Sequence, residues 1–243
     1  MTYKDFREKI KKNRFNPILR KIYQFFSIFR PKKSYSQVGE DLVLDYLLQF
    51  KKKGFYVDVG AYHPVHISNT YKFYKRGWTG IQIEPNYKKS ALLKKYRPNS
   101  INLNVGIGEK EGKAPFYIFD SDAYSTFSAE TAEHNKSLGL KVSEVKEVPI
   151  LALSAIFEQY AKDIEIDFMS VDTEGFDLGV LKTNNWKRYR PHFIVVETVE
   201  ASDKLFGRKL NDVFDRFMKD IDYVPVADTY LNTVYADKYF INR

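Results

Sequence analysis

The apolar positions of the chain first mark out one buried strand. The run from Phe55 to Val59 is short, apolar and rich in β-branched and aromatic residues, and Gly54 and Gly60 bound it. Such a run predicts a strand that is buried on both faces. Residues 68–76 then predict a helix. A glycine between a strand and a helix lets a ligand approach the backbone at the positive end of the helix dipole, so this turn is a candidate binding site.

The same alternation continues along the chain. Further strands are predicted at 79–84, 101–107, 114–119, 166–174 and 192–197, and helices at 87–96, 153–161 and 210–221. The segments 223–226 and 233–239 predict a hairpin at the edge of the sheet. A regular succession of strands and helices predicts a parallel sheet with helices on both faces.

Two stretches depart from this alternation. The polar turn from Ser34 to Asp41 predicts the start of a helix, but its polar density is more than a cap requires; the apolar positions of that helix are Leu42, Val43, Tyr46, Leu47 and Phe50. Residues 120–147 lack clear periodicity. They predict an insertion over the strand ends that serves as a lid or binds substrate, with a disordered surface excursion as the alternative.

The first 33 residues differ in character from the rest. A helix is predicted from Asn16, with one apolar stripe made of Ile18, Leu19, Ile22, Phe25, Phe26 and Phe29. The stripe is too short to span a bilayer, and no small-residue cleavage site follows it. Basic residues flank the stripe, so the helix suits peripheral contact with anionic lipid; packing against its own domain or self-association is the alternative.

Charge and composition support a division between residues 1–33 and residues 34–243. The chain has 243 residues and a net charge of +8, of which residues 1–33 carry +9 and the remainder −1. The main domain is therefore almost neutral, which makes nucleic acid an unlikely partner. No cysteine is present, so disulfides and thiolate chemistry are excluded, and a cytoplasmic location is the simpler interpretation.

Four of the predicted strands end in acidic residues. Asp58 belongs to the first strand, Glu84 to the second, Asp172 and Glu174 to the fourth, and Glu197 to the fifth. The carboxyl ends of parallel strands share one edge of a sheet, so these carboxylates are expected to converge. Clustered carboxylates repel one another and raise each other's pKa, which gives them no structural reason to gather there.

The spacing of Glu84 points to an adenosine cofactor. It lies 26 positions after Asp58, close to the spacing at which an acid accepts the ribose hydroxyls. A dinucleotide needs several glycines around its pyrophosphate, whereas Gly60 stands alone before Ala61 and leaves no phosphate cradle. A cofactor with an adenosine end and no phosphate, such as S-adenosylmethionine, fits this pattern.

Five blocks of the sequence, in order, resemble the FkbM family of S-adenosylmethionine-dependent methyltransferases. They are Ser36-Gln37-Val38-Gly39-Glu40-Asp41, Val57-Asp58-Val59-Gly60-Ala61-Tyr62-His63-Pro64, Ser68-Asn69-Thr70, Gly77-Trp78-Thr79-Gly80-Ile81-Gln82-Ile83-Glu84-Pro85-Asn86 and Asp172-Thr173-Glu174-Gly175. The resemblance covers roughly residues 34–200 and is much more specific than any single glycine motif. It implies an α/β, class I methyltransferase (Rossmann-like) three-layer sandwich. Its sheet would have seven strands, mostly parallel, with an antiparallel C-terminal hairpin.

The resemblance also implies roles for individual residues. The methionine part of the cofactor would lie against Asp58, Gly60 and Ala61, and its amino-acid end against Gln37, Glu40 and Asp41. The ribose would bind Glu84, next to Pro85, and the adenine would lie beside Asn104 and Val105. The activity it implies is methyl transfer to a hydroxyl oxygen, commonly on a sugar of a bacterial surface glycan or secondary metabolite.

Removal of the acceptor's proton needs a base or a metal ion, because a sugar hydroxyl is a very weak acid. Asp172, Glu174, Glu197 and His63 are the candidate catalytic residues. Asp172 and Glu197 are also candidate ligands for Mg²⁺. His63 has the alternative of a purely structural turn residue before Pro64, and Glu174, like Asp177, has that of a helix cap.

The sequence therefore predicts a methyltransferase that acts in glycan modification or polysaccharide biosynthesis, held at the inner face of the membrane by residues 1–33. Two other functions stay open. One is an RNA methyltransferase that uses its basic N-terminus, which the neutral main domain argues against. The other is a non-catalytic adaptor that keeps the fold, which the complete set of acids argues against.

Overall fold

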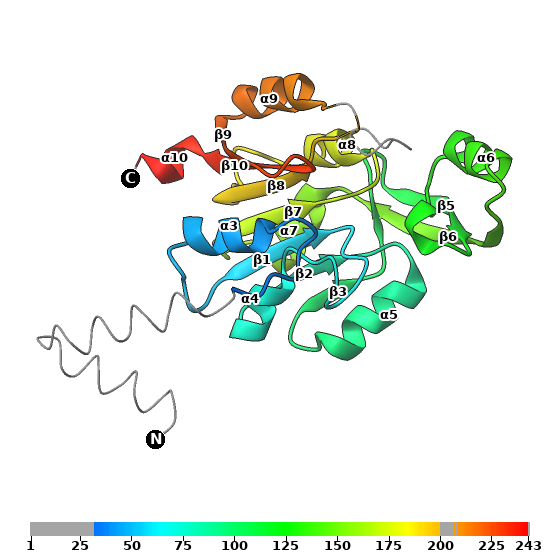
Figure 1. Ribbon diagram of the computed structural model, residues 1–243, viewed down its shortest axis with the longest axis horizontal. Helices are drawn as coiled ribbons and strands as arrows, with labels where there is room; N and C mark the ends of the chain where they lie inside the picture. The colour runs from blue at the N-terminus through cyan, green and yellow to red at the C-terminus, as the bar shows by residue number, and fades with distance from the viewer. Residues whose placement is uncertain (1–31, 200–206, 208, 243) are drawn as a thin grey trace, which may run out of the picture. The chain divides into compact units, whose positions relative to one another are not determined.

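The computed structural model describes residues 32–199, 207 and 209–242, and within these residues the strands form two sheets. The larger sheet has the strand order β3-β2-β1-β7-β8-β10-β9 (Figure 1). Its strands are β1 Phe55–Val59, β2 Thr79–Ile83, β3 Ile101–Leu103, β7 Phe168–Val171, β8 Phe193–Glu197, β9 Tyr223–Asp228 and β10 Asn232–Asp237. The predicted basic helix from Asn16 falls within residues 1–31, outside the described residues.

The direction of the strands follows their connections. β3, β2, β1, β7 and β8 are mutually parallel, because helices carry the chain back between them. β10 is antiparallel to both β8 and β9, and so closes the sheet with the predicted C-terminal hairpin. The expected α/β fold, a mostly parallel seven-stranded sheet with an antiparallel hairpin, is confirmed.

Helices follow most of the strands. They are α3 Glu40–Leu47, α4 Tyr71–Arg76, α5 Tyr87–Tyr96, α6 Ala129–Ser137, α7 Leu153–Tyr160, α8 Asp177–Lys182, α9 Asn211–Asp220 and the short α10 Lys238–Ile241, with a 3₁₀ turn, η1, at Asp122–Tyr124. α4 begins three residues later than predicted, because the Ser68 hydroxyl accepts hydrogen bonds from the amides of Thr70 and Tyr71 before the helix starts.

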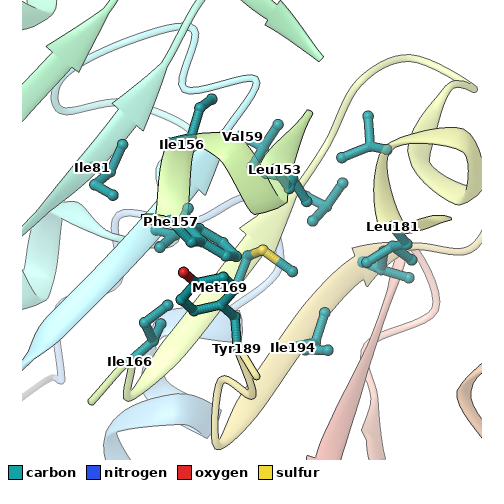
Figure 2. Close-up of a cluster of buried hydrophobic side chains, with 14 of the residues drawn as sticks. Val59, Ile81, Leu153, Ile156, Phe157, Ile166, Met169, Leu181, Tyr189 and Ile194 are labelled. Carbon is teal, nitrogen blue, oxygen red and sulfur yellow. The ribbon is translucent and has the colours of Figure 1, made fainter. Parts of the chain in front are cut away.

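Helices bury both faces of the main sheet. α7, α8 and α9 cover one face, where Leu153, Ile156 and Phe157 of α7 are fully buried against the strands (Figure 2). α3 and α4 pack on the other face through Leu44, Leu48 and Phe73. Full burial of one such side chain contributes about 1.5–3 kcal/mol, so these contacts hold the strands in register and their carboxyl ends in line. Within the described residues no helix has the length and apolar character needed to cross a membrane.

The core-facing side of α3 is not made of the predicted apolar positions alone. Leu44, and Leu48 directly after the helix, are buried in the core, whereas Tyr46, one of the predicted apolar positions, has 71% of its surface exposed. The core-facing side of α3 also includes Glu40 and Asp41, which are fully buried. Hydrogen bonds satisfy both carboxylates there, so these polar residues lie on the inner side of the helix.

The second sheet corrects the prediction of one strand at 101–107 and shows the structure of residues 120–147. The segment 101–107 is two strands, because the chain leaves the main sheet after Leu103 and β4 Gly106–Ile107 pairs with β6 Val142–Leu151 instead. Residues 120–147 are an ordered part of this sheet, since β6 pairs along its length with β5 Gly112–Phe119, and η1 and α6 lie between these two strands. Its core is small, which explains its weak apolar periodicity: it consists of Phe116, Ile118 and Val148 with Phe127 packed against them.

The backbone at the end of β1 requires glycine. Gly60 has a φ of +78°, and a Cβ atom there would lie 1.7 Å from the carbonyl oxygen of Asp172. The missing side chain therefore lets β1 and the residues after β7 lie side by side. This packing role differs from the ligand approach that the sequence predicted for Gly60.

Replacing Gly60 by alanine is expected to destabilise the fold strongly. Positive φ alone costs an alanine about 1–2 kcal/mol, and the contact with the Asp172 carbonyl adds to that cost. Gly139→Ala is the matched control, because Gly139 has a φ of +89° but open space where its Cβ would lie. Urea unfolding of both variants measures the difference. Equal losses of unfolding free energy would contradict the packing role.

Candidate active site at the carboxyl ends of the parallel strands

Four predicted acids lie in a row along one edge of the sheet. Asp58 is the fourth residue of β1, Glu84 directly follows β2, Asp172 directly follows β7, and Glu197 is the last residue of β8. The strands run in the order β2-β1-β7-β8, so the four acids follow one another along the edge. The convergence predicted from the sequence is confirmed.

Asp172 and Glu197 interact electrostatically. Burial, and then the negative charge of Glu197, raise the pKa of Asp172 well above its ordinary range, with smaller contributions from Asp177, Glu174 and Asp58. Burial and the charge of Glu174 also raise the pKa of Glu197. The carboxylates at this edge therefore bind protons more tightly than isolated carboxylates would, and their negative charge favours a cationic ligand.

The segment after β7 is a tight turn built around Asp177. The Asp177 carboxylate accepts hydrogen bonds from the amides of Thr173 and Gly175 and from the Thr173 hydroxyl. Glu174 stands in the middle of this turn with a φ of +54°, a conformation that non-glycine residues rarely adopt. These bonds come from groups that precede α8, so Asp177 closes the turn before the helix, which differs from the helix cap that its sequence position suggested. The turn holds Glu174 at the surface, where crowding by the protein and the charge of Asp177 raise its pKa.

Glu84 is buried beside the end of β1. Its carboxylate accepts hydrogen bonds from the Tyr62 amide at 2.8 Å and from the Asn86 amide at 2.7 Å. Burial outweighs these two bonds and raises the pKa of Glu84 to about 7. Each of its oxygens can accept a further bond, so the residue fits a ligand that presents two hydroxyl donors, as a ribose does.

The first amides of the turn after β1 are already hydrogen-bonded within the protein and form no phosphate cradle. The amides of Gly60 and Ala61 both donate to the Ile83 carbonyl, at 3.0 and 3.1 Å. An anionic ligand would also face the row of carboxylates. This geometry fits a cofactor that carries a positive charge and no pyrophosphate. The residues present therefore fit S-adenosylmethionine, which carries a sulfonium and an ammonium group.

His63 is held by its own turn. Its Nδ1 atom accepts hydrogen bonds from the amides of Val65 and His66, at 3.1 and 3.0 Å. Burial and the nearby His66, Lys89 and Arg97 lower its pKa, so the ring is neutral. A neutral ring whose Nδ1 accepts must carry its proton on Nε2, where it can only donate. This tautomer supports the structural role that the sequence left open, and it makes His63 a poor proton acceptor.

Glu40 and Asp41 are occupied by structural hydrogen bonds. Glu40 accepts from the Thr229 hydroxyl and the Asn232 amide group and so joins α3 to the turn between β9 and β10. Asp41 accepts from the Ser34 and Ser36 hydroxyls and the Tyr35 amide. These bonds account for the excess of polar residues in this segment. Gln37 is exposed in the same turn, so of the three it is the residue most accessible to a ligand.

The predicted adenine side lies at the ends of β2 and β3. Asn104 is exposed, and its side-chain amide donates to the carbonyls of Glu84 and Pro85, both at 2.8 Å. Val105, the next residue, is half-buried against the core. Asn104 therefore joins the end of β2 to the chain after β3 and keeps Glu84 and Val105 on one side of the edge.

One set of residues was missed by the sequence analysis. Arg97, the residue after α5, is fully buried and donates hydrogen bonds to Ser68 and Thr70, and Thr70 in turn donates to Asp58. The block Ser68-Asn69-Thr70 was recognised without a role. Asn69 completes the set, because its amide group donates to Ser170 of β7.

The fit to a metal ion is poorer than the fit to the cofactor. Among the residues that the structure describes, no group of three or more His, Asp or Glu side chains is placed to hold a metal ion.

Comparison with known proteins identifies the family. Residues 58–225 match the family model described as "Methyltransferase FkbM domain". The O-methyltransferase from Bacillus cereus, solved in complex with SAH, is 14% identical, with 94% of each chain covered and a TM-score of 0.37. No curated protein matches the chain.

The chain belongs to the FkbM methyltransferase family, because the family model covers most of its length. It is thus an S-adenosylmethionine-dependent methyltransferase with the class I methyltransferase fold, as the sequence predicted.

The raised pKa of Glu84 predicts a pH-dependent cost to stability. A folded-state pKa of about 7 against an ordinary 4.5 means that protonated Glu84 stabilises the fold fully below about pH 4.5 and that this contribution is lost as the pH rises through 7. Glu84→Gln cannot ionise, so its melting temperature relative to the parent should rise between pH 5 and pH 8. Differential scanning calorimetry of the ligand-free proteins tests this. A difference that does not change with pH would contradict it.

Proposed function

We propose that the protein transfers a methyl group from S-adenosylmethionine to a hydroxyl oxygen of a sugar, on a bacterial surface glycan or its precursor. The observation that carries this proposal is the row of acids beside Glu84, in which Asp172 and Glu197 have raised proton affinity. A sugar hydroxyl must lose its proton as the new bond forms, and carboxylates of this kind suit that task.

In this proposal one end of the row binds the cofactor and the other end removes the proton of the acceptor. Glu84 would accept the ribose hydroxyls, and Asp58 with the turn from Gly60 to Tyr62 would border the methionine part. S-adenosylmethionine supplies the methyl group, which leaves its sulfur as the acceptor oxygen attacks. Asp172 or Glu197, in its ionised form, takes the proton from the acceptor hydroxyl, and the row of negative charges favours the positively charged donor before the reaction.

The second sheet supports an acceptor site next to this edge. Lys89 on α5 pairs with Asp122 of η1 at 2.8 Å, and its ammonium lies 4.3 Å from the ring centre of Tyr62. The second sheet is therefore anchored beside the turn that follows β1. Phe176, two residues after Glu174, has 42% of its surface exposed. Exposed rings beside carboxylates suit the apolar face and the hydroxyls of a sugar.

Mg²⁺ enters this proposal only through Asp172 and Glu197. Two carboxylates are enough for an ion that keeps most of its waters, so assistance by Mg²⁺ is compatible with the proposed reaction. Methyl transfer measured in EDTA and in added Mg²⁺ distinguishes the two cases. Equal rates would assign proton removal to the carboxylates alone.

Removal of either proton acceptor should slow methyl transfer without preventing cofactor binding. Asp172→Asn and Glu197→Gln are each expected to lower kcat about 100-fold, the usual contribution of a general base. Their Kd for S-adenosylmethionine should stay within about threefold of the parent. Transfer of a labelled methyl group into a library of glycan precursors measures the first quantity, and calorimetry the second.

The control for these variants is Glu165→Gln, since Glu165 is exposed and precedes β7 at the opposite edge of the sheet. It should keep the parent rate. Parent-like rates for Asp172→Asn and Glu197→Gln would remove both residues from the reaction. No transfer by the parent to any sugar acceptor would contradict the proposed acceptor.

We also propose that residues 1–33 bring the enzyme to the inner face of the membrane, where glycan precursors are assembled. The net charge of +9 in this segment supports attraction to anionic lipid. The full chain should co-sediment with vesicles that contain anionic lipid, and a chain that begins at Ser34 should stay in solution. Equal behaviour of the two proteins would contradict this role and favour self-association.

A further inference from the structure

A buried arginine joins the loop after β1 to the helix after β2. Arg97 has none of its surface exposed, and its Nε atom donates to the Pro64 carbonyl at 2.8 Å. Its two terminal nitrogens donate to the hydroxyls of Thr70 and Ser68, at 2.7 and 2.8 Å. The guanidinium thus binds three points of one loop, which a lysine ammonium could not do with the same geometry.

The chemistry of these groups sets the direction of their hydrogen bonds. An arginine has only donors, so the Thr70 oxygen accepts from Arg97, and its single proton is donated to the Asp58 carboxylate. The guanidinium itself lies 3.9 Å from that carboxylate. Burial raises the pKa of Asp58, and the charge of Arg97 and the Thr70 bond oppose this effect. Arg97 and Thr70 therefore favour the ionised form of Asp58 against the effect of burial.

The loop that Arg97 binds is strained. Tyr62 and Ile67 have φ values of +41° and +52°, which residues with side chains rarely adopt. The bond from the Tyr62 amide to Glu84 holds one end of the loop, and Arg97 holds the middle and the far end. Strained residues persist where the surrounding contacts over-determine them, and they cluster at ligand sites.

We infer that Arg97, acting through Thr70 and Ser68, is a positioning residue of the methyl-donor site. It holds the loop that borders the methionine part of the donor, and it keeps the charge on Asp58 that faces this cationic part. The inference rests on the proposed function. A merely structural Arg97 would affect stability alone, whereas a positioning residue also sets the affinity for S-adenosylmethionine and the pH dependence of that affinity.

The test replaces Thr70, because this substitution leaves the arginine in place. Thr70→Val keeps the shape of the side chain but removes the bond to Asp58. Thr70→Ser restores the hydroxyl. Thr183→Val is the matched control, since Thr183 is also buried, accepts from the Leu153 amide and donates to the Val180 carbonyl, far along the chain from β1.

Calorimetric titration with S-adenosylmethionine at pH 6, 7 and 8 gives the readout. Thr70→Val should bind about tenfold more weakly at pH 7, as expected for one lost bond to a charged group, and the loss should be larger at pH 6, where Asp58 is more readily protonated. Thr70→Ser should bind within about twofold of the parent. Thr183→Val should lose stability but keep the parent affinity at each pH.

The outcomes separate this inference from the proposed function. If the parent does not bind S-adenosylmethionine, both the positioning role and the proposed function are contradicted. If the parent binds and Thr70→Val binds equally well at every pH, only the positioning role is overturned. If Thr70→Val does not fold, Ser68→Ala takes its place, because it removes another acceptor of Arg97, and parent-like affinity in that variant would overturn the positioning role in the same way.

Discussion

Repulsion among carboxylates at one edge of the main sheet is the constraint on which the rest of the site depends. Parallel strands bring Asp58, Glu84, Asp172 and Glu197 to the same edge, and burial alone would exclude several negative charges from such a place. The protein tolerates them in two ways. Raised pKa values let them keep a proton more readily, and hydrogen bonds from Thr70, Tyr62 and Asn86 oppose the effect of burial on Asp58 and Glu84.

These two solutions correspond to two chemical tasks. A carboxylate with a raised pKa is a stronger base in its ionised form, and Asp172 and Glu197 are of this kind. A carboxylate whose oxygens are held by hydrogen-bond donors presents its acceptor atoms in a fixed position, and Asp58 and Glu84 are of this kind. The division follows the order of the strands, so the methyl donor and the acceptor lie on neighbouring parts of one edge.

Much of this arrangement could be predicted from the sequence, because it depends on short-range pattern. The alternation of strands and helices predicts a parallel sheet, and acids at the ends of strands then must share an edge. The burial of Glu40 and Asp41 on α3 could not be predicted, because both are satisfied by hydrogen bonds that no periodicity reveals. The second sheet was missed, because strand β6 is held mainly by its backbone ladder with β5 and buries few apolar side chains. The role of Arg97 could not be predicted, because its partners are 27 to 33 positions away and lie in an irregular loop.

The central claim is that the carboxylates at this sheet edge bind the methyl donor. Calorimetric titration of the parent protein with S-adenosylmethionine, repeated in buffers of different ionisation enthalpy, tests it most directly. The account predicts binding that releases protons near pH 7, because ribose hydroxyls and a cationic donor both favour ionised carboxylates. Binding without proton release, or no binding, would contradict it.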